Sequence, residues 1–166
     1  MAGDRLWAPW RLRYIRGEKA GGKEANECIF CAKPALDDES ALIVRRGDRC
    51  FVMLNAFPYT SGHVMVAPYE HTADLAALDE ATALELTTLT QESIRAIRLS
   101  YSPEGFNVGA NLGTVAGAGV ADHLHFHVVP RWEGDTNFMS VIGDVRVLPE
   151  GLEDTQRRLK EAFATP

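Results

Sequence analysis

The spacing of apolar and polar residues predicts five short strands in this chain. Three of them precede residue 70 and two follow residue 105, over residues 41–45, 49–55, 63–67, 106–111 and 123–129. Gly47 and Asp48 lie between the first two strands and favour a hairpin turn there.

Two helices are predicted by a wider apolar spacing, of roughly 3.6 residues. Asp79 can cap the first helix, which keeps its apolar side chains along one side until about residue 99. The second helix covers residues 151–164. Strands in series with one long helix between them predict an α+β fold, with an antiparallel sheet of about five strands and an additional C-terminal helix.

Residues 1–27 are set apart from this domain by their composition. The polar, Gly-rich segment 17–26 is typical of a flexible loop, and it follows an aromatic N-terminal arm. We therefore expect an arm and loop over 1–27 and a single domain over 28–166. The sequence contains neither an apolar run of the roughly 20 residues that span a bilayer nor a secretory signal, so we expect a cytoplasmic protein without membrane partners.

The charge of the chain narrows the possible partners. Its formal net charge is −6, and broad binding to a nucleic-acid backbone requires a positive surface, so no nucleic-acid partner is expected. A small phosphate ligand remains compatible with an acidic protein because a pocket can be locally positive. Three cysteines are too few for a disulfide framework, and Cys50, in an apolar run, is expected to be a buried free thiol.

Three of the five histidines alternate with apolar residues, as His123, His125 and His127. On a strand, alternate side chains share a face, so the three imidazoles would project together at spacings of about 6.7 Å. A single half-buried histidine is usually structural. Three of them each need partners for two ring nitrogens, and they cannot all be charged. The alternation therefore predicts a functional site.

Two chemistries use such a face. Metal binding would need further ligands, and although Glu133 can supply a carboxylate, no histidine follows His127. Nucleophilic catalysis would use a neutral imidazole that attacks phosphorus while its neighbours hold the charged oxygens. Its second nitrogen would then donate to an acceptor, for which a backbone carbonyl is expected. The strand alone does not decide between the two.

Three separated motifs resemble the histidine triad family. HLHFHVV, at 123–129, matches the family signature His-φ-His-φ-His-φ-φ, in which φ is apolar. The segments LNAFPYTSGHVMVAPYEH and GFNVGANLGTVAG are similar to the two family motifs that precede it, and the resemblance covers roughly 28–140. PRWEGDTNFM and LWAPWRLRYI further resemble the branch of bacterial diadenosine tetraphosphate phosphorylases and their fragile-histidine-triad-like relatives.

The resemblance implies a role for each matching residue. His125 would be the nucleophile, attacking the α-phosphorus of a dinucleoside polyphosphate to form a nucleotidyl-histidine, and His127 and His63 would stabilise the phosphate oxygens. Asn55 matches a position that contacts the sugar, and Asn111 matches one near the phosphates. On the residues alone, both asparagines are almost as well explained as turn residues that bond to backbone.

The loop before the triad departs from the family pattern. The family commonly has Ala-Gly-Gln-Ser/Thr-Val there, whereas this chain has AGAGVAD, which is longer and lacks the amide and hydroxyl groups. Backbone N–H groups around Gly117 and Gly119 can cradle phosphate instead. Small residues also leave room for inorganic phosphate as a second substrate, which favours phosphorolysis slightly over hydrolysis.

Cys28 and Cys31 have the CxxC spacing of a zinc knuckle or a redox pair, and no thioredoxin-like pattern surrounds them. The resemblance implies a structural zinc completed by His71 and His123. Two ordinary exposed cysteines are the alternative. No organic cofactor is implied, and the substrate can arrive as its Mg²⁺ complex.

Three functions therefore remain open. A dinucleoside polyphosphate phosphorylase or hydrolase is favoured over a nucleoside phosphoramidase, because the chain lacks the Trp-Pro-Pro-Gly ending of the phosphoramidase branch. A purine-nucleotide-binding regulatory protein with little turnover is the third. The resemblance also implies a homodimer that pairs through strands and the long helix.

Overall fold

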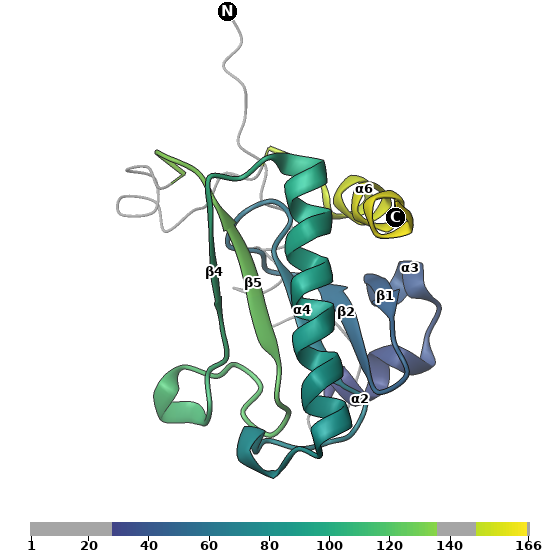
Figure 1. Ribbon diagram of the computed structural model, residues 1–166, viewed down its shortest axis with the longest axis vertical. Coiled ribbons are helices and arrows are strands. Elements are labelled where there is room, and N and C mark those ends of the chain that lie inside the picture. Colours follow the sequence, from purple (N-terminus) through teal and green to yellow (C-terminus); the bar gives the residue numbers. More distant parts are fainter. Residues whose placement is uncertain (1–27, 136–148, 166) are drawn as a thin grey trace, which may run out of the picture.

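The fold is described from a computed structural model, which covers residues 28–135 and 149–165 (Figure 1). The arm and loop predicted over 1–27 lie outside the described residues. Within them, five antiparallel strands form one sheet in the order β1-β2-β3-β5-β4. The strands are β1 Ile43–Arg46, β2 Cys50–Leu54, β3 Val64–Pro68, β4 Gly105–Gly109 and β5 Phe126–Arg131. The predicted fold class is confirmed.

The predicted hairpin joins β1 and β2, and a carboxylate from the long helix holds it. Glu85 accepts hydrogen bonds from the backbone N–H groups of Arg49 and Cys50, at 3.1 and 3.3 Å. A Cβ atom on Gly47 would lie 1.9 Å from the same carboxylate oxygen. A side chain at position 47 would therefore require the Glu85 carboxylate to move away from the turn that it holds.

Two strand starts differ from the sequence prediction. The first strand begins at Ile43 rather than at residue 41, because Asp37 caps a short helix, α3 (Asp38–Ala41), which ends at Leu42 with φ 61°. The last strand begins at Phe126 rather than at residue 123. Residues 123–125 leave the ladder because the backbone N–H of Leu124 donates instead to Thr72 O, at 2.6 Å.

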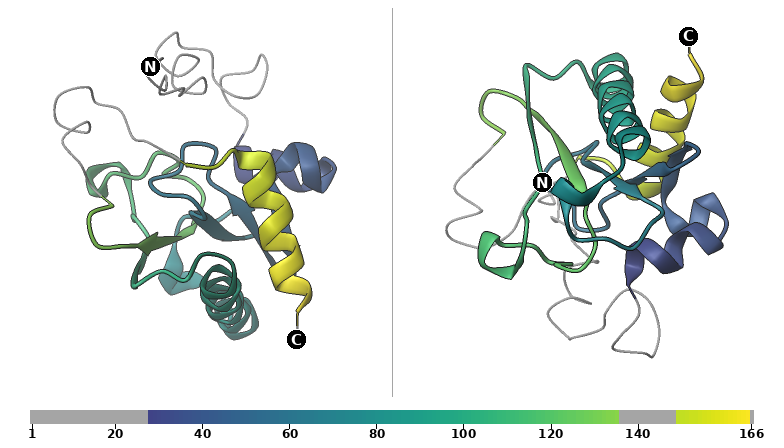
Figure 2. Two further views of the ribbon diagram at one scale, coloured as in Figure 1. Left: turned by 90° about the horizontal axis from the view of Figure 1, so that it is seen from above. Right: turned by 60° about the horizontal axis from the view of Figure 1, so that its bottom comes forward.

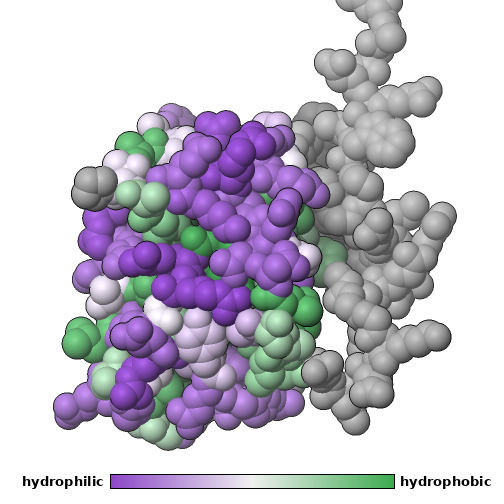
Figure 3. All heavy atoms as spheres, turned by 90° about the vertical axis from the view of Figure 1, so that its right-hand side faces the viewer, coloured by the Kyte–Doolittle hydropathy of each residue, from purple (hydrophilic) through white to green (hydrophobic). Residues whose placement is uncertain are grey.

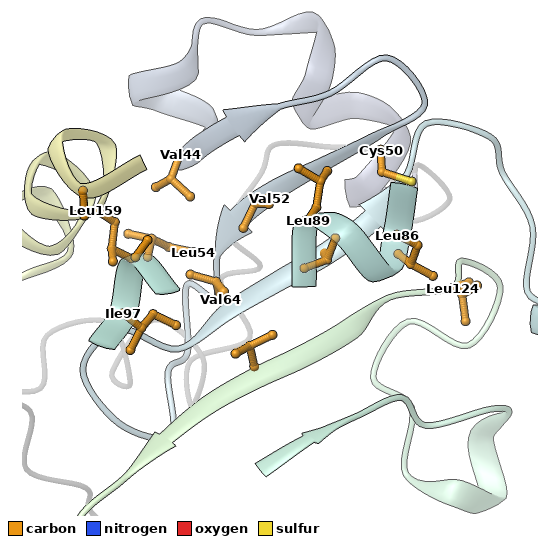
Figure 4. Close-up of a cluster of buried hydrophobic side chains, with 14 residues drawn as sticks. Val44, Cys50, Val52, Leu54, Val64, Leu86, Leu89, Ile97, Leu124 and Leu159 are labelled. Carbon is orange, nitrogen blue, oxygen red and sulfur yellow. The ribbon is translucent and has the colours of Figure 1, made fainter. Parts of the chain in front are cut away.

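The long helix α4 (Glu80–Tyr101) covers one face of the sheet, with the C-terminal helix α6 (Leu152–Ala164) beside it (Figures 1 and 2). Asp79 caps α4 as predicted, since its carboxylate accepts from the N–H groups of Ala81 and Thr82. Apolar side chains of both helices and of the sheet fill the space between them (Figure 4), among them Val52, Leu54, Val64, Leu86, Leu89, Ile97, Leu124 and Leu159.

α6 is attached to the edge of the sheet by one buried polar residue. Gln156 donates from its amide to the backbone oxygens of Asp38 and Ile43, at 2.5 and 3.1 Å. The outer side of this helix is charged, and the face of the molecule that includes it is mainly hydrophilic (Figure 3). No helix in the described ranges is both long enough and apolar enough to cross a bilayer.

The opposite face of the sheet carries a second apolar cluster that the sequence did not predict. It contains Phe30 from the four-residue helix α2 (Ile29–Ala32), and it includes Ile43, Phe51, Met53, Met65 and Ala67 from the strands. A row of paired residues crosses this face, from Ile43 through Met53 and Met65 to His127 and Gly109. The histidine site therefore lies on the face away from α4.

Three short 3₁₀ helices complete the described part of the chain: η1 (Lys33–Ala35), η2 (Leu75–Ala77) and η3 (Thr114–Ala116). η1 continues α2, and η2 lies between β3 and α4. η3 lies in the loop between β4 and β5 that leads to the histidines.

Candidate active site and metal site

His63, His125 and His127 meet on the sheet face opposite α4. His63 immediately precedes β3, and His127 lies in β5, where it pairs with Met65 of β3. The alternation predicted from the sequence is preserved although only His127 of the triad lies in the ladder. Leu124 points into the cluster beneath α4 (Figure 4), and so does Val128.

The tautomer of His125 follows from one hydrogen bond. Its Nδ1 lies 2.8 Å from the backbone oxygen of His123, and because a carbonyl oxygen only accepts, Nδ1 must carry the proton. In the neutral ring, Nε2 therefore keeps its lone pair. The sequence led us to expect a backbone carbonyl in this position. His125 is 5% exposed, and its burial lowers the pKa of the imidazole, which favours the neutral form.

A chain of hydrogen bonds fixes the protons of the other two imidazoles. The backbone N–H of Tyr59 donates to His63 Nδ1 at 3.1 Å, so a neutral His63 carries its proton on Nε2. That Nε2 lies 2.9 Å from His127 Nδ1 and donates to it. A neutral His127 then carries its own proton on Nε2 and can act as a hydrogen-bond donor from that atom.

His127 is neutral near pH 7. Burial lowers the pKa of this imidazole to about 4, and repulsion from His125 lowers it in the same direction. The rings of His125 and His127 meet edge to face, with centroids 5.0 Å apart. The site thus combines a buried imidazole that has a lone pair on Nε2 with a neighbouring imidazole that has a proton on Nε2.

The two asparagines singled out in the sequence both make local backbone bonds. Asn55 directly follows β2, and its side-chain oxygen accepts from Phe57 N at 2.9 Å, while its amide nitrogen lies 3.5 Å from His63 Nδ1. Asn111 follows β4 and donates to Gly117 O at 3.4 Å. Asn55 thus borders the imidazoles, and Asn111 holds the loop that precedes the triad.

That loop presents backbone rather than side chains. Gly117 ends η3 with φ 90°, and a Cβ atom on Gly119 would meet nothing within 4 Å. The open space at Gly119 agrees with the sequence argument that small residues here leave the backbone accessible.

Cys28, Cys31, His71 and His123 form a second constellation, adjacent to the first. Their four ligand atoms all lie within 4.8 Å of one another. His123 Nδ1 lies 3.3 Å from Cys28 Sγ and 3.3 Å from His71 Nδ1, and Cys31 Sγ lies 3.2 Å from His71 Nδ1. Two ordinary exposed cysteines would not be expected to meet two imidazoles in this way.

The donor set and its surroundings fit a tetrahedral zinc ion. Zn–S bonds of about 2.3 Å and Zn–N bonds of about 2.0 Å place tetrahedral ligand atoms roughly 3.3–3.8 Å apart, which is close to the distances above. His123 Nε2 lies 2.9 Å from Pro68 O and donates to it, so Nδ1 offers its lone pair to the cluster. A ligating histidine commonly has such a backbone partner on its second nitrogen.

Comparison with known proteins identifies the family to which this chain belongs. Residues 38–134, more than half of the chain, match the family model described as the HIT domain, where HIT stands for histidine triad. The chain belongs to the histidine triad family. Its His123, His125 and His127 are the residues that match the motif from which the family takes its name.

Several histidine triad proteins are similar to this one over much of its length. A protein named AP-4-A phosphorylase from Mycobacterium tuberculosis is 44% identical over 166 residues, which cover 97% of this chain and 85% of that protein. Adenosine 5'-monophosphoramidase of Schizosaccharomyces pombe is 32% identical over 63% of this chain and 74% of its own length. A crystal structure described as a Zn-bound histidine triad family protein from Mycobacterium smegmatis has a TM-score of 0.65 and 31% identity, covering 83% of this chain and 94% of that one.

Two aromatic residues of this histidine triad protein border the imidazoles and were missed in the sequence. The ring of Phe30 stacks on His125, and the ring of Tyr59 lies 4.7 Å from that of His63. Tyr59 belongs to the motif that contains His63, so its position was a weak signal. Phe30 gave no signal in the sequence, because its partner His125 lies far away from it along the chain.

Proposed function

We propose that this protein is a nucleotidyl transferase that cleaves diadenosine tetraphosphate by phosphorolysis, with His125 as the nucleophile. The observation that carries the proposal is the bond from His125 Nδ1 to the backbone oxygen of His123, because it leaves a lone pair on Nε2 of a neutral imidazole. The similarity to a mycobacterial AP-4-A phosphorylase along nearly the whole chain supports this substrate class.

The first chemical step would form a nucleotidyl-histidine. The lone pair of His125 Nε2 attacks the α-phosphorus, a P–N bond forms, and the bond from phosphorus to the bridging oxygen breaks, so that ATP leaves with the electron pair. The imidazole ring becomes positively charged while Nδ1 keeps its proton. The oxygen of His123 lies 2.8 Å from that Nδ1 and stabilises the charge.

His127 would stabilise the negative charge that gathers on the phosphate oxygens. In its neutral form it presents an N–H group at Nε2, and His63 maintains this tautomer through the bond of 2.9 Å between them. Donors that are oriented before the reaction lower the barrier without reorganising during it. His63 thus contributes by fixing which nitrogen of His127 carries the proton.

The second step would release the nucleotide from His125. An oxygen of inorganic phosphate attacks the same phosphorus, the P–N bond breaks, and the products are ADP and a neutral His125. We propose that the inorganic phosphate binds at the loop around Gly117 and Gly119, where backbone N–H groups can donate hydrogen bonds. A Cβ atom at Gly119 would meet nothing within 4 Å, so the loop leaves space for the ligand. Asn55 and Asn111 are assigned to the sugar and to the phosphates.

Turnover of diadenosine tetraphosphate with and without added phosphate tests this reaction. We expect equal amounts of ATP and ADP in the presence of phosphate, with a rate that depends on its concentration. Formation of AMP and ATP at the same rate without phosphate would show hydrolysis and remove the phosphorolysis proposal, while the nucleophile assignment would stand.

A nucleoside phosphoramidase is the second candidate, and the similarity to the yeast adenosine 5'-monophosphoramidase favours it. Both reactions would share His125 and differ in the group that leaves. Adenosine 5'-phosphoramidate offered as a substrate separates them. We expect its kcat/KM to be lower than that of diadenosine tetraphosphate, and the reverse order would favour the second candidate.

We further propose that Cys28, Cys31, His71 and His123 bind a structural zinc ion. Its support is the convergence of the four ligand atoms and the backbone partner of His123. Bound there, zinc would join the segment around α2 to the residues just before β5. Three cysteines are too few for a disulfide framework, which supports the reducing cytoplasm as the compartment that we propose for the protein.

We also propose a homodimer that forms along β4. Among the described residues, β4 is an edge strand and pairs only with β5. Val108 on this strand is 46% exposed, and Leu99 at the adjacent end of α4 is 62% exposed. An edge strand beside exposed apolar side chains favours pairing with a second chain.

A further inference from the structure

The aromatic ring of Phe30 lies flat against the imidazole of His125. The two ring centroids are 4.6 Å apart and the planes are inclined by 27°. The same ring lies 5.2 Å from that of His123, tilted by 37°. Phe30 is 1% exposed, so its side chain is fully enclosed between the sheet and the histidine segment.

The hydrogen bond of His125 does not by itself fix the plane of its ring. The bond from Nδ1 to the oxygen of His123 fixes one edge of the imidazole, but the ring can still rock about the direction of that bond. His127 meets His125 edge to face, with an angle of 73° between the planes. A ring stacked on the flat side blocks the rocking that would turn Nε2 away from its direction of attack.

The segment that carries Phe30 is itself held on both sides. The backbone N–H groups of Cys31 and Ala32 both donate to Cys28 O at 3.0 Å, which closes the turn around Phe30. Cys28 Sγ lies 3.3 Å from His123 Nδ1, and Cys31 Sγ lies 3.2 Å from the ring of His71. Cys28 and Cys31, which lie on either side of Phe30 in the sequence, therefore both contact His123, two residues before the nucleophile.

We propose that Phe30 is a positioning residue, whose ring holds the plane of the His125 imidazole so that Nε2 remains aimed at the α-phosphorus. This inference rests on the proposed function, in which His125 is the nucleophile. Phe30 touches neither the substrate nor the reacting atoms in this scheme and acts through His125 alone. A small misplacement of a reacting group can cost about 100-fold in rate, so the stacking contact has a kinetic consequence.

The matched pair of variants is Phe30→Leu and Phe51→Leu. Phe51 belongs to the same apolar cluster, is equally buried at 0% exposure, and stacks on Tyr69 with centroids 5.2 Å apart. Both substitutions remove one aromatic ring from one core, so both should lower thermal stability. We expect Phe30→Leu to reduce kcat by about 10- to 100-fold with KM changed less than about threefold, and Phe51→Leu to retain kcat.

A second readout follows the His125 ring directly, without turnover. Only five histidines occur in the chain, so selective ¹³C labelling gives five ring signals, and His125→Asn identifies the signal of His125. Removal of a stacked aromatic ring should shift and broaden this signal in Phe30→Leu and leave it in place in Phe51→Leu. Zinc content is measured for both variants, so that a lost metal ion is not mistaken for a lost stacking contact.

Phe30→Tyr keeps the aromatic face and should restore kcat to within about threefold of the unsubstituted protein. If Phe30→Leu does not fold, Phe30→Met takes its place in the same comparison. Equal kcat values for the two leucine variants, or an unmoved His125 signal in Phe30→Leu, would overturn the inference. Absence of turnover in the unsubstituted protein would overturn the proposed function instead, and the signal of His125 would still report on the stacking.

Discussion

Backbone groups, rather than charged side chains, set the tautomers of the imidazoles in the site. The oxygen of His123 places the proton of His125 on Nδ1, and the N–H of Tyr59 places that of His63 on Nε2. His127 takes its tautomer from His63. Because these groups belong to the fold itself, the correct lone pair is presented before any substrate arrives.

Replacement of His125 by Asn should abolish turnover of diadenosine tetraphosphate. The amide has no nitrogen lone pair that can attack phosphorus, so we expect a loss on the order of 10⁴-fold or more. Binding of AMP or ATP, measured by calorimetry, should change little, since the rest of the site is retained. Near-normal turnover in this variant would remove the nucleophile assignment and the proposed function with it.

Gly62 sets the turn from which His63 projects, and alanine at this position should destabilise the protein. Gly62 has φ 83°, and a Cβ atom there would lie 3.2 Å from the ring of Tyr101. We expect a loss of about 1–2 kcal/mol in the free energy of unfolding, measured by denaturant titration. Gly105→Ala is the control, because φ there is not positive and its Cβ would meet nothing within 4 Å. Equal stability of the two variants would contradict this account of Gly62.

At the scale of elements, the cysteine–histidine cluster joins the segment around α2 to the segment that enters β5. It brings Cys28 and His123 together, and a metal ion there would act on both segments at once. Cys50 offers an internal reference, since it is fully buried in β2 and its burial raises the pKa of the thiol to about 12. A thiol of this kind is protonated and unreactive in the folded protein.

Thiol titration together with metal analysis tests the zinc site. We expect about one zinc ion per freshly purified chain and no reactive thiol in the folded protein. A chelator should release the metal and expose Cys28 and Cys31, whereas Cys50 should react only after unfolding. Cys31→Ser should lose zinc and Cys50→Ala should retain it. Less than about half an equivalent of zinc, or two reactive thiols before chelation, would count against the site.

The sequence predicted the elements that have a clear apolar pattern. Continuous apolar runs marked β2 and β3, which are buried at every position, and the apolar side of α4 marked the long helix. The short helices α2 and α3 have too few residues to show a period. The start of β5 at Phe126 depends on a bond from Leu124 to Thr72, and no local pattern records that bond.

The candidate site was predictable to a similar extent. The histidine alternation pointed to a site on physical grounds, whereas the ligand set and the roles of the asparagines came from family resemblance. Phe30 could not have been found from the sequence. Its contact with His125 joins residues that are far apart along the chain, and only the folded structure brings them together.

At the scale of the whole molecule, the sheet has two edges of different character. β1 is covered by α3 and by the Arg46 side chain, which donates to Asp38 Oδ1 at 2.7 Å. β4 has polar and apolar residues exposed along most of its length. The asymmetry favours association through β4 and not through β1.

Light scattering after size exclusion tests the dimer and its position. We expect a mass of twice the chain's 18.3 kDa for the unsubstituted protein. Val108→Lys introduces a charge on β4 and should give a monomer, because a like-charged pair would face itself across the interface. Leu36→Lys is the control, since Leu36 is 51% exposed and its backbone oxygen accepts from Arg46 beside the opposite edge. A monomeric unsubstituted protein, or a dimer that survives Val108→Lys, would contradict this interface.

The connection between Cys28 and His123 also constrains when the site can appear during folding. These residues are 95 positions apart, so their contact closes a loop that contains most of the sheet and all of α4. During synthesis, four of the five strands are made before the imidazole of His125, which stacks on Phe30 in the folded protein. A nascent chain that has not reached residue 125 therefore holds the phenylalanine but not its imidazole, and competence for nucleotide chemistry arrives among the last events of assembly.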